Sequence, residues 1–189
     1  MTAPMATDPA HAARRLLCER GAATLDHPGG TLLAHLDRVH RQLVRWNARP
    51  ELQLAGLCHA LYGTDGFAPY LVPLHQRARV REIVGTEAES LVYFYASCDR
   101  RATYPGATGP AARFRDRFTG RTFTPAPRRW EEFAELTAAN ELDIAHADVD
   151  FRARCGADLL DLFTRMRPLL TPAAWQDCEN TLRGSGGTA

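Results

Sequence analysis

The sequence contains no lysine, so all 23 of its basic residues are arginines. This bias is typical of a GC-rich bacterial genome and indicates no particular mechanism. Basic and acidic residues nearly cancel, 23 against 22, whereas proteins that bind nucleic acids or membrane surfaces usually carry a positive excess. We therefore expect no nucleic-acid partner and no membrane partner.

Cysteine pairs and long apolar runs are also missing. The five cysteines form no CxxC pair, which argues against a zinc knuckle and against a disulfide framework. Cys58 and Cys98 stand in apolar runs and are predicted to be buried thiols. The N-terminus has no apolar signal-peptide core, and no run approaches the roughly 20 residues of a membrane-spanning helix. These absences favour a cytoplasmic protein.

The chain also has no internal repeats and no heptads, and it reads as one unit. Its 189 residues are enough for a single domain with a sizeable core. We expect that domain to span 1–189, with flexible tails at 1–9 and 184–189. Apolar residues recur at helical spacing along most of the chain. The prediction is an all-α fold of about six to seven helices with a small β-hairpin insertion centred on Thr119-Gly120.

Capping residues suggest where several of these helices begin. Asp8 is expected to cap a helix from Pro9 to Arg20, Thr31 to cap the next, and Pro50 to open the third. Thr86 is expected to cap a further helix, with Glu89 at the capping-box position. The remaining helices are expected at about His75–Val84, Trp130–His146, Ala157–Leu169 and Thr171–Leu182.

Two histidines interrupt apolar helix faces in the segment from His27 to Phe67. His35 lies at the edge of the stripe that includes Leu36, and His59 is the one histidine of its otherwise largely apolar helix before Tyr62. The glycine-containing run 63–66 follows. One interpretation is a site at the helix ends, and the other is a pair of core histidines that each bond a backbone carbonyl. The residues alone leave both interpretations open.

The spacing of these histidines resembles a known family. A histidine followed 24 positions later by another that closes an AGLCH run is similar to the HD-domain superfamily of metal-dependent phosphohydrolases, and to small alarmone (guanosine polyphosphate) hydrolases in particular. Gly29-Gly30 precede His35 as a Ser-Gly loop does there, and AGLCHA carries His59. The segments REIVGTEAESLVYFY and TAANELDIA resemble later helices of that family, the second of which bears its last metal ligand.

The sequence departs from that family at the residues that carry its chemistry. Ala60 stands where an aspartate follows the second histidine, Gly63 and Thr64 replace the acidic pair that activates water, and Asn140 replaces the distal aspartate. The run HALYGT in place of HDxxED is similar to an uncharacterised bacterial branch of the superfamily. The resemblance therefore implies an HD-domain-like helical bundle and the location of a site, but not ordinary alarmone hydrolysis, because an amide oxygen is a weak metal ligand.

Asp99 is the candidate replacement for the lost carboxylate. With His35 and His59 it would form a His/His/Asp set suited to a divalent Fe, Mn or Zn ion; the alternative is an ion pair between Asp99 and an arginine at a helix end. Tyr62 and Asp65 are the candidate catalytic residues at the mouth of the site, and Tyr62 is alternatively a buried structural group. The candidate substrate-binding residues are His27, Thr64, Arg79, Arg100 and Asn140.

Three functions fit this pattern. The first is a metal-dependent hydrolase of a small, possibly phosphorylated metabolite. The second is a non-haem iron oxygenase on the same ligands. The third is a metal-free HD-like protein that binds a small molecule, which the loss of both aspartates favours. A homodimer is possible, because Trp130, Phe133 and Trp175 fit a partner surface as well as a core.

Overall fold

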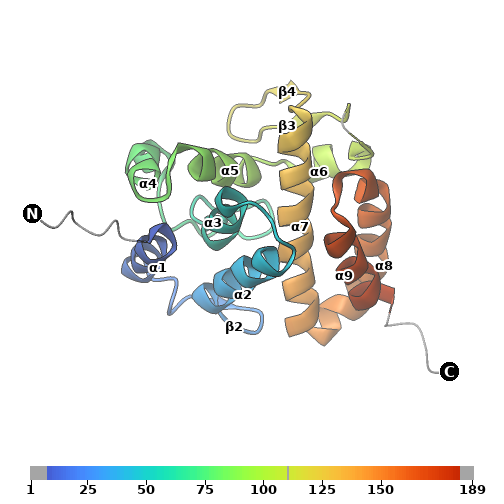
Figure 1. Ribbon diagram of the computed structural model, residues 1–189, viewed down its shortest axis with the longest axis horizontal. Coiled ribbons are helices and arrows are strands. Elements are labelled where there is room, and N and C mark those ends of the chain that lie inside the picture. Colours follow the sequence, from blue (N-terminus) through green and yellow to red (C-terminus); the bar gives the residue numbers. More distant parts are fainter. Residues whose placement is uncertain (1–7, 110, 184–189) are drawn as a thin grey trace, which may run out of the picture.

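The computed structural model describes residues 8–109 and 111–183. Of the tails expected at 1–9 and 184–189, residues 1–7 and 184–189 lie outside the described residues, whereas Asp8 caps the first helix and Pro9 begins it. The described chain forms nine α-helices, three 3-10 turns and two two-stranded sheets, which confirms the all-α prediction (Figure 1). The helices are α1 (Pro9–Glu19), α2 (Leu32–Arg45), α3 (Pro50–Cys58), α4 (Arg77–Val84), α5 (Thr86–Ala96), α6 (Arg100–Thr103), α7 (Pro127–Ala147), α8 (Val149–Met166) and α9 (Pro172–Arg183).

Local capping chemistry explains the starts of the first three helices. Asp8 accepts a hydrogen bond from the backbone N–H of Ala10, Thr31 accepts one from that of Ala34, and Pro50 is the first residue of α3. These side chains satisfy backbone donors that have no partner inside the helix. The starts expected for α1, α2 and α3 are therefore confirmed, and α1 ends at Glu19, one residue before the expected Arg20.

The capping box expected for α5 is wrong. Its N-cap is Gly85, which has φ of 85°, and no side chain caps the helix. Glu89 instead points into the protein, where it is 1% exposed and pairs with Arg77 and Arg81 of α4. A buried carboxylate with two guanidinium partners is bound more strongly than a capping carboxylate in solvent, so tertiary contacts override the local pattern.

The long helix α7 stands at the centre of the molecule. In Figure 1 it runs as a column with α1–α5 on one side and α8 and α9 on the other. Its buried residues include Glu132, Glu135, Asn140, Glu141 and Asp143. Buried polar groups are destabilising unless they find hydrogen-bond partners. These side chains of α7 therefore need partners within the interior.

The aromatic residues that could have faced a partner belong to the core. Trp130, Phe133 and Trp175 are 0, 2 and 9% exposed, respectively. They therefore contribute to folding and offer no dimer surface. Cys58 and Cys98 are buried, as predicted. In the part of the chain that the structure describes, no helix combines the length and the apolar character needed to cross a bilayer.

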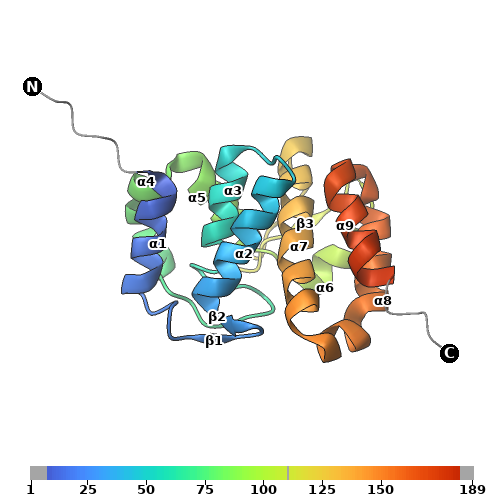
Figure 2. The same cartoon turned by 60° about the horizontal axis from the view of Figure 1, so that its bottom comes forward.

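Two short hairpins decorate the helices. The expected one pairs β3 (Phe114–Arg115) with β4 (Thr122–Phe123). A second, β1 (Asp26–His27) with β2 (Gly30–Thr31), stands where the sequence suggested only a loop. Figure 2 shows it at the N-terminal end of α2. It turns through Gly29, which has φ of 79° and whose added Cβ would lie 2.6 Å from the Cβ of Ala147, so the turn packs closely on the end of α7.

Candidate functional site

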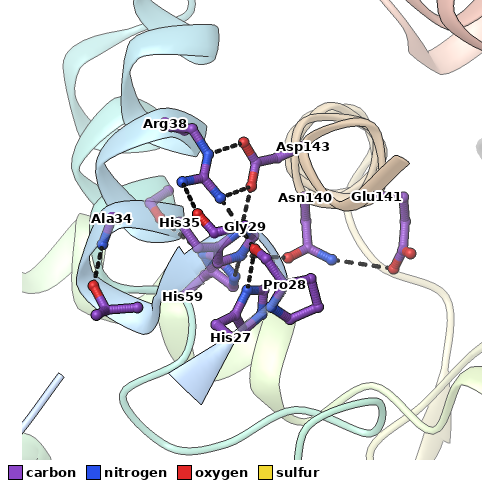
Figure 3. Close-up of polar contacts among 12 residues, drawn as sticks. His27, Pro28, Gly29, Ala34, His35, Arg38, His59, Asn140, Glu141 and Asp143 are labelled. Atoms are coloured by element: carbon purple, nitrogen blue, oxygen red, sulfur yellow. Dashed lines mark hydrogen bonds and ion pairs between the residues drawn. The ribbon is translucent and has the colours of Figure 1, made fainter. Parts of the chain in front are cut away.

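Two histidine rings and one amide meet between α2, α3 and α7 (Figure 3). His35 projects from α2, His59 directly follows α3, and Asn140 projects from α7. The Nε2 atoms of the two histidines are 3.3 Å apart, and Asn140 Oδ1 is 3.1 Å from His35 Nε2. The three residues are 1, 2 and 6% exposed. The structure therefore brings the two histidines together at the end of their helices.

The second nitrogen of each ring is committed to an acceptor. His35 Nδ1 donates to Asp143 Oδ2 at 2.6 Å, and His59 Nδ1 donates to the Gly56 carbonyl at 2.8 Å. Each Nδ1 thus carries the hydrogen, so in a neutral ring the Nε2 atom bears a lone pair. Burial, with His35 as a further cause, lowers the pKa of His59 to about 3, which keeps that ring neutral near pH 7.

The orientation of Asn140 is fixed by its neighbour on α7. The Nδ2 group donates to Glu141 Oε1 at 3.1 Å. Because an ionised carboxylate only accepts hydrogen bonds, the amide nitrogen faces Glu141 and the amide oxygen faces the histidines. When both rings are neutral, three acceptors point at one another with no donor between them. Either a shared proton or a cation relieves this arrangement.

The spacing of the three acceptors suits a metal ion. In a tetrahedral site with bonds of about 2.0–2.1 Å, ligand atoms lie roughly 3.3 Å apart, which is close to the 3.3 and 3.1 Å found here. Histidines that bind metals generally donate their other ring hydrogen to a carboxylate or a carbonyl, as both do here. Among residues 8–109 and 111–183, however, no cluster of three or more His, Cys, Asp or Glu side chains is arranged to hold a metal. Asn140 would have to be the third ligand.

Asp99 does not join the histidines, so the predicted His/His/Asp set needs correction. The sequence suggested the C-terminal end of a helix, but α5 ends at Ala96 and Asp99 is the N-cap of α6. Its carboxylate accepts from the N–H of Ala102 at 2.9 Å and lies 3.4 Å from Arg115. This is the ion-pair alternative, and the carboxylate stands at the favourable end of a helix dipole.

The two expected catalytic residues also lie outside the lining of the cavity beside the histidines. The Tyr62 hydroxyl donates to Glu89 at 3.0 Å, and burial together with Glu89 raises its pKa, so it keeps its proton. Asp65 accepts a hydrogen bond from the backbone N–H of Arg100 at 2.7 Å, which ties the turn that contains Asp65 to the start of α6. Arg79 is exposed on α4 and does not reach the cavity.

Four of the expected substrate-binding residues do line a cavity of about 210 Å³ at the histidine pair, namely His27, Thr64, Arg100 and Asn140. Most of its other wall is apolar, with Leu32, Phe67, Ile144 and Phe151. The Arg100 guanidinium is 2.8 Å from Glu141 and packs against Gly66, whose added Cβ would lie 2.9 Å from Arg100 Nη1. The cavity is thus small, largely apolar and supplied with one cationic wall.

The unexpected β1–β2 hairpin delivers His27 to the cavity. Its ring stacks on His35 with centroids 4.0 Å apart and lies 5.5 Å from the Phe67 ring. Burial, followed by the nearby His35, lowers the pKa of His27 to about 4, so its ring is neutral near pH 7. The hairpin therefore covers the histidine pair with a third imidazole.

Asp143 and Arg38 are the site residues that sequence reasoning missed. Asp143 accepts from His35 and from two nitrogens of Arg38, at 2.7 and 3.0 Å. Burial alone would raise the pKa of the Asp143 carboxyl, but these hydrogen bonds lower it, so the group stays ionised. Sequence spacing could have indicated them, because Arg38 lies one helical turn after His35 and Asp143 lies one turn after Asn140.

Comparison with known proteins gives one partial similarity. A family model described as a domain of unknown function (DUF6817) matches residues 16–100, which is less than half of the chain. The matched segment contains His27, His35, His59 and Arg100 but stops before α7, which supplies Asn140 and Asp143. Neither the curated proteins nor the solved structures include a match to this chain.

Proposed function

We propose that this protein is a metal-dependent hydrolase of a small, possibly phosphorylated metabolite, with the ion held by His35, His59 and Asn140. The observation that carries the proposal is that, with both rings neutral, three hydrogen-bond acceptors meet with no donor between them. The resemblance to the HD-domain superfamily, including the location of the site, is part of the proposal. Asp99 has no role in it, because its carboxylate is used at the start of α6.

The surrounding residues support this set of metal ligands. When bound, a divalent ion lowers the pKa of a coordinated water and polarises a substrate oxygen. The ionised Asp143 accepts the Nδ1 hydrogen of His35, which increases the basicity of the opposite nitrogen and fixes the ring. The carbonyl of Gly56 orients His59 in the same way. The two imidazoles are thus held in place before any ligand arrives.

The cavity restricts the substrate to a small group. Its volume of about 210 Å³ is below the range of roughly 300–1,000 Å³ typical of pockets for drug-sized ligands. The Arg100 guanidinium bonds Glu141 through one nitrogen and has further N–H groups, which suit a phosphoryl or carboxylate oxygen; His27 also lines the cavity. The apolar wall excludes water around the reacting group. We infer a compact anionic substrate, or the anionic end of a larger one.

A metal-free binding pocket is the second candidate. It is favoured because, among the described residues, no third His, Cys, Asp or Glu side chain is arranged with the two histidines to hold a metal. Neutral imidazoles and an amide hold divalent ions less tightly than a set that includes an anion. In that case one ring would be protonated and would donate a hydrogen bond to Asn140 or to the other ring. The cavity would then bind a metabolite without catalysing a reaction.

Element-resolved metal analysis of untagged protein, purified without added metal, separates these functions. The proposal expects near-stoichiometric zinc or manganese and release of phosphate from a panel of small phosphate esters and anhydrides. Iron with oxygen-dependent turnover would instead indicate the oxygenase. If the protein holds no metal, either as purified or after incubation with each ion, the metal site is contradicted. The metal-free binding pocket is then the remaining function.

Two histidine variants make the assignment specific. His59→Gln is expected to lose the metal while retaining a polar side chain near Gly56. His75→Gln is the matched control, since it removes an exposed histidine outside the cavity and should retain the metal. Far-UV circular dichroism of both variants checks that the helices are intact. Metal retained by folded His59→Gln would overturn the ligand assignment.

A further inference from the structure

A second concave surface lies behind the histidine cavity, between α2, α7, α8 and α9. It consists of two adjoining hollows of about 450 and 270 Å³, which share Gln42, Arg45 and His146. We call it the arginine groove. Its basic residues are Arg38, Arg41 and Arg45 from α2, His146 from α7 and Arg152 from α8.

Most of the positive charge in the arginine groove has no internal partner. Within the described residues, Arg38 pairs with Asp143, whereas Arg41, Arg45 and Arg152 form no ion pair. By contrast, Asp37 of the same helix pairs with Arg14 at 2.7 Å. Arg38, Arg41 and Arg45 follow one another at three and four residues, so they lie along one face of the helix. Like charges at this spacing repel one another.

The two acids in the arginine groove are already bonded. Asp143 accepts from His35 and Arg38. Asp177 accepts from Gln42 Nε2 at 2.5 Å and from Trp46 Nε1 at 2.7 Å. With four arginines against these two carboxylates, the groove keeps an excess of positive charge even when His146 is neutral. Among the described residues, Arg41, Arg45 and Arg152 therefore keep their guanidinium groups without an acidic partner.

We propose that the arginine groove is a second binding site, and that it takes a ligand with two or more linked phosphoryl groups. Guanidinium groups are planar forks that suit the paired oxygens of a phosphoryl group. Arg41 and Arg45 lie about 6 Å apart along the helix axis, and Arg152 approaches from α8. A single phosphate ion is therefore too small to bond all three arginines. A diphosphate or longer chain reaches several of them at once.

The arginine groove is separate from the histidine cavity. Figure 3 shows the Arg38–Asp143 ion pair beside His35, and this pair belongs to the lining of the smaller hollow. Neither hollow of the groove includes His27, His59 or Arg100, which line the cavity. The proposal therefore does not rest on a metal or on hydrolysis at the histidines.

Calorimetric titration with inorganic pyrophosphate tests the site in chelator-treated full-length protein, so that no ion bridges the probe. We expect saturable binding that weakens by about tenfold in Arg45→Gln and in Arg152→Gln, and a weaker affinity for inorganic phosphate than for pyrophosphate. Arg154→Gln is the matched control, because it makes the same change at an exposed position of α8 outside the groove; its affinity should equal that of the parent.

Three results would overturn the proposal. They are the absence of saturable pyrophosphate binding, an equal loss of affinity in Arg154→Gln, and phosphate binding as tight as that of pyrophosphate. Loss of binding in His59→Gln would also contradict it, since that would assign the anion to the histidine cavity. Because each arginine variant replaces an exposed or half-buried side chain, unchanged circular dichroism spectra should accompany these comparisons.

Discussion

Two buried polar clusters in this protein differ in the balance of their hydrogen bonds. Glu89 is 1% exposed and accepts four hydrogen bonds, one from Tyr62, two from Arg77 and one from Arg81. The cluster of His35, His59 and Asn140 is also buried, and when both rings are neutral it brings acceptors together without a donor. The Glu89 cluster is complete, whereas the histidine cluster then requires an added proton or a cation.

The difference explains why burial alone is a poor guide to function. Tyr62 was an attractive catalytic candidate because it follows His59 closely in the sequence, but its hydroxyl completes the Glu89 cluster. A polar side chain whose partners are all within the protein stabilises the fold and offers nothing to a ligand. An incomplete set of partners is the feature that marks a site.

The largest effect is expected from breaking the complete cluster. Glu89→Ala should lower the free energy of unfolding by about 3 kcal/mol, because it leaves two guanidinium groups and a buried hydroxyl without their common acceptor. Urea denaturation measures this loss. Glu82→Ala, at an exposed position of α4, is the control and should change stability by less than about 0.5 kcal/mol. Equal effects would remove the contrast between the clusters.

Asp143→Asn tests the support of the incomplete cluster. The substitution removes the charge that holds the Nδ1 hydrogen of His35, so we expect metal affinity to fall by about 10- to 100-fold. Isothermal titration of chelator-treated protein with zinc or manganese measures the change. Asp177→Asn removes a carboxylate that bonds Gln42 and Trp46 instead, and its metal affinity should match that of the parent protein.

Asn140→Asp tests the set of metal ligands itself. A carboxylate at this position supplies the anionic ligand that the site lacks, so metal affinity should rise by about tenfold. Without metal the same variant should be less stable, because the new charge stands beside Glu141. Asn180→Asp makes the same change at an exposed position of α9 and should leave affinity unchanged. An affinity of Asn140→Asp equal to or below that of the parent would contradict the assignment of Asn140.

The smallest effect is expected at His40, whose buried Nδ1 has no partner among the described residues. Burial, with Arg14 as a further cause, lowers the pKa of His40. The unfolded chain therefore binds this proton more readily, and stability falls as pH drops below the ordinary value of about 6.5. Stability measured from pH 7.5 to 5 should fall less steeply in His40→Gln than in the exposed control His11→Gln. Parallel curves would exclude a contribution from His40.

Much of the fold follows from local rules. Asp8, Thr31 and Pro50 mark helix starts that the structure contains, because capping and the missing N–H of proline act within a few residues. The hairpin around Thr119-Gly120 was predictable for the same reason, and Gly120 adopts φ of 71°. Glu89 was misjudged because its partners come from a different helix, which a local pattern does not reveal.

The site was only partly predictable. The helical faces of His35 and His59 indicated that the rings could meet, and the resemblance pointed to the position of Asn140. The roles of Asp99 and Asp143 depend on how α6 and α7 pack, since one carboxylate ends beside Arg115 and the other beside His35. The β1–β2 hairpin that places His27 also depends on close packing against Ala147, for which the sequence carries no short-range signal.

Anomalous diffraction from crystals of the untagged protein grown with zinc would locate the metal itself. We expect one element-specific peak at about 2.0–2.2 Å from His35 Nε2, His59 Nε2 and Asn140 Oδ1. Zinc confined to other positions, with His35 or His59 donating a hydrogen bond directly to Asn140, would contradict it.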